Sequence, residues 1–400
     1  MALLSDITVL DFTRVLAGPY ATMTLADFGA RVIKVEPPGG EETRAVGECF
    51  VAGTAVPFLM VNRGKQSVCV DLRAAEAREI VRRLVARSQV VVHSFRAEFA
   101  AEIELDYDSV RRIRPDVVYG AISGYGDAEE HRGKPALDTV VQALAGLMYA
   151  SGEEGDPPVR IGVPVVDLSA GMATALGLVA AILAWQRTGQ GQRLDVSLLD
   201  AVLGFMLLKI GECTAAGREP RREANLPAVV PSRHFQGADG RYLSVTAFGE
   251  KFFRRLAAIV GRPEWLADPR FSTNAARVRN RYELTAALAE AFRRRPAAQW
   301  LRELEAAGIP CAPVQTVSEA LADPAVARAL AEHPALRGVR LVRAPVRLPD
   351  GMRGVEEMLP PPAIGEHTAA VLREAGFSQP QIEALAAREV IRLGAAGEVR

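Results

Sequence analysis

One segment constrains the fold of this chain more than any other: the eighteen residues from Leu168 to Trp185 carry no charged side chain. They are rich in alanine and glycine and follow an apolar approach that ends at Asp167. Their length just reaches that of a membrane-spanning helix. Because Gly189 and Gly191 stop the segment and a strand and helix pattern follows, we expect a helix over about 168–187, buried between layers of protein.

Asp167 stands at the start of this helix, and two roles fit it. An aspartate at a helix start can accept hydrogen bonds from the free N–H groups of the first turn. The helix dipole at the same place favours an ionised carboxylate, which is the state of a nucleophile. Spacing alone favours the cap, because aspartate is among the commonest N-cap residues.

The N-terminal residues predict a compact βαβ unit. Residues 7–12 are typical of a strand, a helix is expected over about 20–28, and residues 31–36 alternate as a second strand. Such a unit implies a parallel sheet with a ligand crevice at the carboxyl ends of its strands. A nicotinamide dinucleotide site with Glu36 on the ribose is disfavoured, because the turn before Pro19 has one glycine where that fingerprint needs three.

Patterns further along extend this unit to an α/β fold with a second domain. Additional strands are expected at 65–72, 90–95 and 117–122. Four hundred residues exceed the usual size of a single core, so two domains are expected. The polar, proline-containing stretch at 212–232 marks a linker. A hairpin over 233–246 and three later helices then indicate a smaller α+β domain.

Charge and composition exclude several classes of function. Lys plus Arg and Asp plus Glu both number 48, so no net field favours nucleic acid or an anionic membrane. The four cysteines are far apart, which fits reduced thiols, and the five histidines show no metal-ligand spacing. Because the N-terminal residues show no secretory leader, we expect a cytoplasmic protein. From the charge balance and the scattered histidines, we expect neither a membrane partner nor a bound metal.

Several stretches of the chain, in the same order, resemble the family III CoA-transferases. They are LDFTRVLAGPYATMTLADFGARVIKVEPPGGEETR, NRGKQSVCVDLR, GVPVVDLSAG with RTGQGQRLDVSLLDA, and IGEHTAAVLREAGFS. The resemblance implies a Rossmann-like large domain at 1–212 that binds CoA, a small α+β domain at 213–325, and a segment at 326–400 that returns to the large domain. It also implies an interlocked, ring-shaped homodimer, and it favours Asp167 as the nucleophile rather than a cap.

The resemblance further implies a set of CoA-binding residues at the strand ends. The backbone of Leu16 and Ala17 is expected to lie along the CoA chain, and Val70, Asp71, Leu72 and Arg73 are expected to surround the adenine. The other members of the set are Ser94, Phe95 and Arg96, which follow a predicted strand, and the acidic Asp138. An aromatic and an arginine at a strand end can stack on adenine or hold a phosphate. This edge departs from the family pattern at His93 and Ser94, and Glu102 stands where the family has an arginine. The residues that would bind the phosphates of CoA are therefore the part of the site that the resemblance defines least.

Leu137 separates this chain from the racemase branch of the family, which has a histidine there to exchange an α-proton. His131 is the only local substitute. The residues expected to hold the carboxylate of a small dicarboxylate substrate are Arg14, Arg44 and Arg233. Oxalate is disfavoured, because the residues that match the oxalate contacts of one family member differ.

The expected function is transfer of CoA from an acyl-CoA thioester, for example succinyl-CoA, to a free carboxylic acid. Asp167 would carry the acyl group as a mixed anhydride and the CoA as an aspartyl thioester. The oxyanion donors are expected from the helix turn after Asp167 or from the small domain. CoA is then a substrate, and no permanently bound cofactor is expected. Two alternatives remain open: an acyl-CoA racemase or isomerase, and a CoA-binding protein without catalysis.

Overall fold

The computed structural model describes residues 2–220, 222, 229–333, 336–346 and 360–394. The chain divides into two compact units. Unit 1 comprises Met1–Ala145, Ile161–Ile210 and Arg328–Arg400, and unit 2 comprises Gly146–Arg160 and Gly211–Ala327. Composition places a boundary near residue 212 but cannot assign an internal segment to another unit, so the position of Gly146–Arg160 in unit 2 was not expected.

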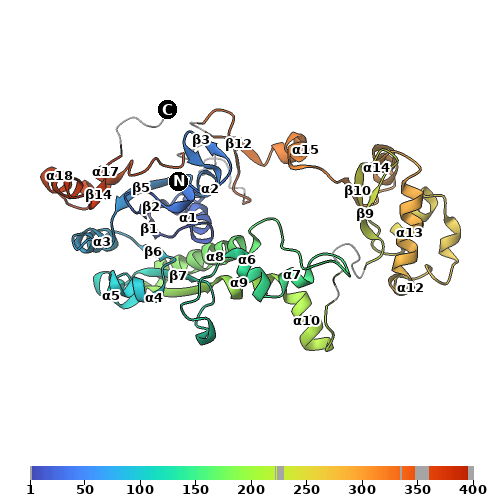
Figure 1. Cartoon of the computed structure of the whole chain (residues 1–400), viewed down its shortest axis with the longest axis horizontal. Coiled ribbons are helices and arrows are strands. Elements are labelled where there is room, and N and C mark those ends of the chain that lie inside the picture. Colours follow the sequence, from blue (N-terminus) through green and yellow to red (C-terminus); the bar gives the residue numbers. More distant parts are fainter. Residues whose placement is uncertain (1, 221, 223–228, 334–335, 347–359, 395–400) are drawn as a thin grey trace. The chain divides into compact units, whose positions relative to one another are not determined.

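Unit 1 is built on a seven-stranded, mostly parallel sheet (Figure 1). Its strand order is β14-β5-β2-β1-β6-β7-β8. The parallel strands are β1 (Thr8–Phe12), β2 (Arg31–Glu36), β5 (Lys65–Val70), β6 (Val90–His93), β7 (Val118–Ser123) and β8 (Gln192–Ser197). At one edge β14 (Ile391–Arg392) pairs antiparallel with β5. The expected βαβ unit is present, since α1 (Ala17–Asp27) joins β1 and β2.

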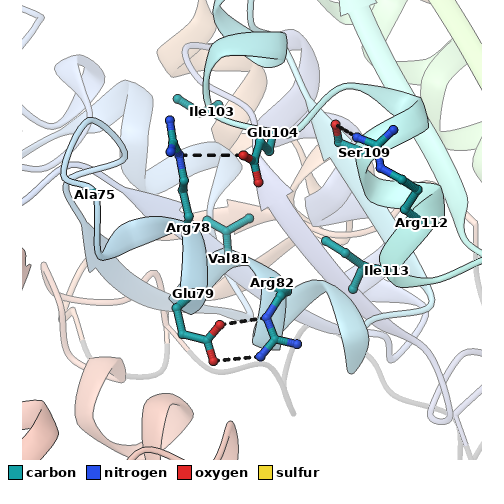
Figure 2. A pocket seen from close by; sticks show the side chains of 10 residues that line it. All are labelled: Ala75, Arg78, Glu79, Val81, Arg82, Ile103, Glu104, Ser109, Arg112 and Ile113. Carbon is teal, nitrogen blue, oxygen red and sulfur yellow. Dashed lines mark hydrogen bonds and ion pairs between the residues drawn. The ribbon is translucent and has the colours of Figure 1, made fainter.

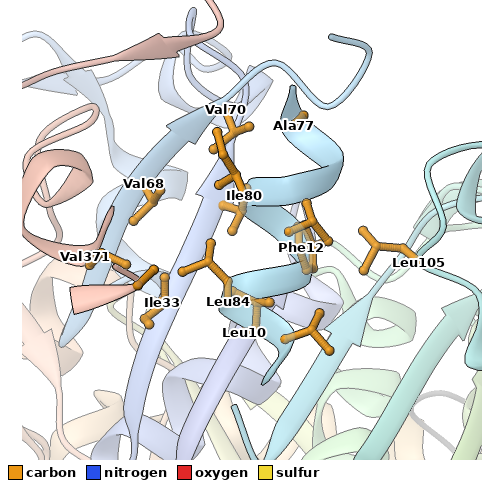
Figure 3. Packing of buried hydrophobic residues seen from close by; sticks show 14 of the residues in the cluster. Leu10, Phe12, Ile33, Val68, Val70, Ala77, Ile80, Leu84, Leu105 and Val371 are labelled. Atoms are coloured by element: carbon orange, nitrogen blue, oxygen red, sulfur yellow. The ribbon is translucent and has the colours of Figure 1, made fainter. Parts of the chain in front are cut away.

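Side chains alternate between the two faces of this sheet, and each face packs against its own helices. One core lies between the sheet and α3 (Ala77–Ala86), α5 (Tyr107–Ile113), α17 (Thr368–Glu374) and α18 (Gln379–Ala387). In Figure 3, Ile80 and Leu84 of α3 point toward Leu10, Phe12 and Ile33 of the strands. The other core contains the alternate strand residues, such as Val9 and Val32, together with residues of α1 and α8 (Val165–Thr188).

Helix α8 is the uncharged helix that the sequence predicts. It begins at Val165 after Pro164 and ends at Gly189, whose φ of +70° suits glycine. Leu178 and Ile182 pack into the core, whereas Met172 and Leu176 are exposed. Among the described residues α8 is long and apolar enough to cross a membrane, and half of its most apolar window is buried in the chain. In the single chain, therefore, only one of its faces is covered, not both as expected.

The rest of unit 1 consists of short elements around the sheet. They are η1 (Glu42–Arg44), β3 (Phe50–Val51), β4 (Thr54–Ala55), α2 (Val56–Val61), α4 (Ala97–Glu102), η2 (Glu129–His131), α6 (Asp138–Leu144), α9 (Leu198–Phe205), β12 (Leu330–Glu332) and β13 (Arg340–Val342). The helix α10 (Leu207–Ala216) continues from unit 1 into unit 2.

Unit 2 is an α+β unit around a three-stranded antiparallel sheet. The strands β9 (Ser232–Gln236), β10 (Tyr242–Thr246) and β11 (Cys311–Pro313) have the order β11-β10-β9, and β9 and β10 form the expected hairpin. Its core contains Phe253, Phe292 and Trp300. The helical elements are α7 (Leu147–Ala150), α11 (Glu250–Ile259), η3 (Pro263–Leu266), α12 (Asn274–Arg279), α13 (Arg281–Phe292), α14 (Ala297–Ala306), α15 (Val317–Ala322) and α16 (Pro324–Ala327).

Candidate active site

Asp167 lies in the first turn of α8, where the structure tests one of the two roles considered for it, that of the helix cap. The N-cap position is Pro164, which makes no side-chain capping bond, and Asp167 stands three residues further into the helix. Its carboxylate has no hydrogen-bond donor among the described residues. Asp167 is therefore not the cap of its helix, and its partly exposed carboxylate is available for other chemistry.

The cap of α8 comes instead from Asp138, the first residue of α6. Asp138 Oδ2 accepts hydrogen bonds from the backbone N–H of Val166 at 2.8 Å and of Asp167 at 3.2 Å. Asp138 Oδ1 accepts from Gln142 Nε2 at 2.7 Å, and Gln142 Oε1 accepts from Ile161 N at 2.9 Å. One face of α6 thus fixes both the approach to α8 and the backbone of Asp167.

This arrangement changes the acidity of Asp167. Burial disfavours the charged carboxylate, and the nearby negative charge of Asp138 adds to this effect, so that the pKa of Asp167 rises to about 6. The carboxylate is mainly ionised at neutral pH but more basic than an ordinary aspartate. A side chain of this kind is suited to attack a carbonyl carbon.

The turn before α1 brings Leu16 and Ala17 close to the same helix. Leu16 is the residue before α1, and Ala17 is buried at its first position. A Cβ added at Gly171 would lie 2.7 Å from the carbonyl oxygen of Ala17, so α1 and α8 pack backbone to backbone at this point. Gly171 follows Asp167 by one helical turn. The structure thus brings two of the expected CoA-binding positions to the helix of the expected nucleophile.

Ser94 and Phe95 follow β6, and Arg14 lies beside them. Ser94 Oγ accepts from Arg14 N at 3.2 Å, and the Arg14 guanidinium lies 5.9 Å from the centre of the Phe95 ring. Phe95 N donates to Nδ1 of the buried His93, whose Nε2 lies 2.6 Å from Tyr119 Oη. Burial lowers the pKa of His93 to about 4, so it is neutral and holds the Phe95 loop by hydrogen bonds.

The remaining expected CoA-binding residues lie at the carboxyl ends of β5 and β6. Val70 is buried in the core, so only its backbone could face a ligand, while Leu72 packs partly against that core. Asp71 N donates to Val390 O at 2.8 Å, and Asp71 Oδ1 accepts from Arg73 N at 3.0 Å. Arg73 and, after β6, Arg96 are exposed.

Arg44 does not occupy a substrate-binding position. It is 8% exposed, forms a two-point ion pair with Glu36 at 2.8 and 2.7 Å, and lies over the Phe58 ring at 3.7 Å. A second bond from its Nη2 reaches the Pro362 carbonyl. The Arg44 guanidinium is thus engaged within the protein and is not free to bind a substrate carboxylate, contrary to the prediction from the sequence. The same pair removes Glu36 from the ribose-binding role of a dinucleotide site.

Arg233 lies in unit 2, on β9. Its guanidinium lies 3.2 Å from Glu153 Oε1, in the segment that precedes Asp167 in the chain, and the side chain is about one-fifth exposed. A substrate carboxylate would have to replace Glu153 to bind it. Within unit 1, Leu137 is exposed and His131 stacks on Tyr125 at a ring distance of 4.7 Å.

A pocket of about 390 Å³ lies elsewhere in unit 1, between α3, α5 and the end of α4. Figure 2 shows that arginine and glutamate side chains line it, with Arg82 paired to Glu79 and Arg78 facing Glu104. None of the expected site residues lines this pocket. Among the described residues, no cluster of three metal-ligating side chains occurs.

The geometry described above can be compared with known proteins. The model of CoA-transferase family III matches residues 4–368. The chain belongs to this family. It is accordingly an enzyme of the CoA-transferase type.

Relatives and solved structures agree with this assignment. The acetyl-CoA:oxalate CoA-transferase of Acetobacter aceti is 35% identical over 93% of this chain and 95% of its own length. The succinyl-CoA–D-citramalate CoA-transferase of Chloroflexus aurantiacus is 33% identical over 97% and 98%. A crystal structure of a CaiB/BaiF family protein from Brucella suis has a TM-score of 0.84 and 34% identity, covering 94% of this chain and 99% of that chain.

Sequence reasoning missed two features of the site. The first is the capping of α8 by Asp138, which the family resemblance implies only as a CoA-binding residue. The spacing of Asp138 and Gln142, four residues apart on one helix face, is a signal for a shared partner that was not used. The second is the set of buried charges Asp11, Lys34 and Lys65, of which Asp11 and Lys34 interrupt apolar strands and Lys65 begins one.

Proposed function

We propose that this enzyme moves CoA from an acyl-CoA thioester to a free carboxylic acid through covalent intermediates on Asp167. One observation carries the proposal: the Asp167 carboxylate is partly buried, has a raised pKa and has no hydrogen-bond donor in the described part of the chain. It lies one helical turn before Gly171, where α8 meets the Ala17 carbonyl. CoA and acyl-CoA are substrates in this proposal rather than resident cofactors.

The chemistry has four steps. Ionised Asp167 attacks the thioester carbonyl, the C–S bond breaks, and a mixed anhydride and the CoA thiolate form. The thiolate attacks the Asp167 carbonyl, which releases the donor acid and leaves an aspartyl-CoA thioester. The acceptor carboxylate attacks this thioester, and a second anhydride and the thiolate form. The thiolate then attacks the acceptor acyl carbonyl, which gives the new acyl-CoA and free Asp167.

Each tetrahedral intermediate needs hydrogen-bond donors aimed at its oxyanion. The first N–H groups of α8 do not supply them. The N–H groups of Val166 and Asp167 are bound to Asp138, and that of Leu168 donates to Pro164 O at 3.0 Å. Of the two sources expected from the sequence, the helix turn after Asp167 is thus disfavoured.

Asp167→Ala tests the proposal directly. We expect it to abolish transfer while leaving the affinity for free CoA within about threefold. Hydroxylamine trapping of wild-type enzyme with acyl-CoA, followed by peptide mass mapping, should modify Asp167. Asp106→Ala is the matched control, because Asp106 caps α5 by accepting from Ser109 N at 3.0 Å, and its loss should cost only stability.

Retained transfer by Asp167→Ala would end the proposal. Deuterium exchange at the α-carbon of acyl-CoA without a free acid would instead support a racemase, and tight CoA binding without either reaction would support a binding protein. Leu137, where the racemase branch has histidine, argues against the first of these.

A small dicarboxylate pair with succinyl-CoA as donor is the substrate class that we propose. Arg14, exposed beside Phe95, and Arg233, paired with Glu153, are the arginines that support it. Relatives named for glutarate, mesaconate and D-citramalate support the same class. Oxalate belongs in the test panel because a relative 35% identical is named for it. Acyl-CoA donors assayed against these acids by mass spectrometry would identify the pair.

We also propose a cytoplasmic homodimer without nucleic-acid or membrane partners. Apolar side chains at the ends of α9 and α10 are exposed in the single chain, with Phe205 at 61% and Leu208 at 78%. Leu176 on α8 is exposed at 73%. Three large exposed apolar side chains on consecutive helices are typical of a protein interface. This surface supports a second copy of this chain as the partner.

A further inference from the structure

A cluster of buried charges lies below the turn that leads into α1. Asp11 of β1, Lys34 of β2 and Lys65 of β5 have no exposed surface. Lys65 Nζ lies 3.1 Å from Asp11 Oδ2, and Lys34 Nζ lies 2.6 Å from Glu41 Oε2. Asp11 and Lys34 are register partners, so their side chains share one face of the sheet.

Stability alone does not account for this cluster. Removing an ion from water is unfavourable, and replacing a buried ion pair by apolar residues of similar volume is often neutral or stabilising. Burial lowers the pKa of Lys65 to about 8 although Asp11 is its partner, whereas the neighbouring opposite charges lower the pKa of Asp11 and raise that of Lys34 despite burial. The pairing therefore offsets the desolvation of Asp11 and Lys34 but only part of that of Lys65. The cluster therefore calls for a role other than stabilisation.

Several hydrogen bonds of the cluster hold the turn at residues 13–17 and the start of α1 that follows it. Thr13 donates to Asp11 Oδ1 through its N–H at 2.8 Å and its hydroxyl at 2.5 Å, and Lys34 Nζ donates to Thr13 O at 2.9 Å. On the other side of the turn, Lys65 Nζ donates to Pro19 O at 3.0 Å. Both ends of the turn are thus held by buried charges.

The turn is held in a conformation that it would not adopt alone. Val15 has a φ of +68°, a left-handed conformation that is strained for a β-branched residue. Such strain persists where the surrounding structure determines the backbone. Gly18 allows the close return of the chain, because a Cβ there would lie 2.2 Å from Thr13 Cβ.

The far end of the turn contacts the helix of Asp167. The Ala17 carbonyl meets α8 at Gly171, where there is no room for a Cβ. The position of the turn therefore sets the distance between the Leu16–Ala17 backbone and the Asp167 carboxylate. Displacement of reacting groups by about 1 Å can cost about 100-fold in rate.

We propose that Asp11, Lys34 and Lys65 are positioning residues, which hold the turn at residues 13–17 against α8 so that a thioester lying along the turn meets Asp167. This inference rests on the proposed function, because it takes the turn as the element that binds CoA. The cluster acts through the turn and does not touch the reacting atoms.

A double variant, Lys34→Met with Glu41→Gln, tests the proposal. It removes the bond from Lys34 to Thr13 and leaves the net charge unchanged, so that no buried charge is left without its partner. The control is Asp27→Asn with Arg63→Met, which removes a pair that is equally buried, at 2.6 Å, at the other end of α1.

We expect both double variants to fold with melting temperatures within a few degrees of each other. In the Lys34/Glu41 variant alone, amide hydrogen exchange at residues 13–17 should accelerate at least tenfold. The Kd for free CoA should rise about tenfold. The value of kcat/KM should fall about 100-fold, partly because KM rises and partly because kcat falls.

Unchanged turn exchange and CoA affinity in the Lys34/Glu41 variant would overturn the proposal. Equal losses in both double variants would also overturn it, because a general loss of stability would then be the cause. Wild-type enzyme that binds CoA but transfers none would refute the chemistry on Asp167, whereas CoA affinity and amide exchange would still report on the cluster.

Discussion

At the scale of single residues, the pair Asp138 and Asp167 links structure and acidity. Asp138 binds the backbone N–H of Asp167, and its charge adds to the effect of burial on the Asp167 carboxylate. The same carboxyl group thus fixes the backbone of the proposed nucleophile and raises the pKa of its side chain. A more basic carboxylate is a better nucleophile, provided that it stays ionised at the working pH.

The pH dependence of transfer follows from this pair. The proposed mechanism requires ionised Asp167, whose pKa is raised to about 6, so kcat/KM should fall about tenfold per pH unit below pH 6 and level off above it. Asp138→Asn removes the neighbouring charge and keeps a carbonyl oxygen for the two amides. In a profile of kcat/KM measured from pH 4.5 to 8.5, the fall in activity on the acid side (the acid limb) should lie at lower pH for this variant than for the wild-type enzyme. A limb at the same pH in both enzymes would contradict this assignment.

The raised pKa also has a stability consequence. Its folded value of about 6 exceeds the unfolded value near 3.9, so ionised Asp167 destabilises the fold at neutral pH, and this effect disappears as the pH falls from 6 to 4. Asp167→Asn should therefore raise the free energy of unfolding by about 1–2 kcal/mol at pH 7 and by almost nothing at pH 4. Urea denaturation at both pH values measures this; an equal gain at both would argue for a cause other than charge.

At the scale of elements, the sequence predicts what repeats locally and misses what depends on tertiary contact. A short apolar run identified β1, alternation identified β2, and the charge-free run identified α8, although that helix begins at Val165, three residues earlier than expected. The capping of α8 by Asp138 joins residues 28 and 29 positions apart, which no local pattern reveals. Similarly, a lysine within a strand is typical of an exposed face, whereas Lys34 and Lys65 are fully buried.

The contact between α1 and α8 gives a prediction about two glycines in neighbouring helices. In Gly171→Ala, the added Cβ would lie 2.7 Å from the Ala17 carbonyl and would push α1 from α8. We expect a loss of about 1–3 kcal/mol in unfolding free energy and at least a tenfold loss in kcat/KM. Gly204→Ala in α9 meets nothing within 4 Å and should stabilise the protein by about 0.5–1 kcal/mol with unchanged kinetics. Wild-type kinetics in Gly171→Ala would show that this contact does not position the site.

At the scale of the whole molecule, the exposed apolar residues of α8, α9 and α10 need a partner. A monomer that exposed Leu176, Phe205 and Leu208 together would be prone to association. A homodimer covers such a surface with the same surface of a second chain. We expect a mass of about 86 kDa by light scattering, twice the 43.0 kDa of one chain.

An interlocked dimer differs from an ordinary one in how its subunits exchange. Two rings that thread each other cannot separate while both are folded, so exchange requires unfolding, whose half-life for stable proteins extends to days. We expect no mixed dimers after differently tagged dimers are incubated together for a day, and mixed dimers after joint unfolding and refolding from urea. Exchange within minutes under native conditions would show that the subunits dock side by side, because a surface-docked pair dissociates at a rate set by its interface alone.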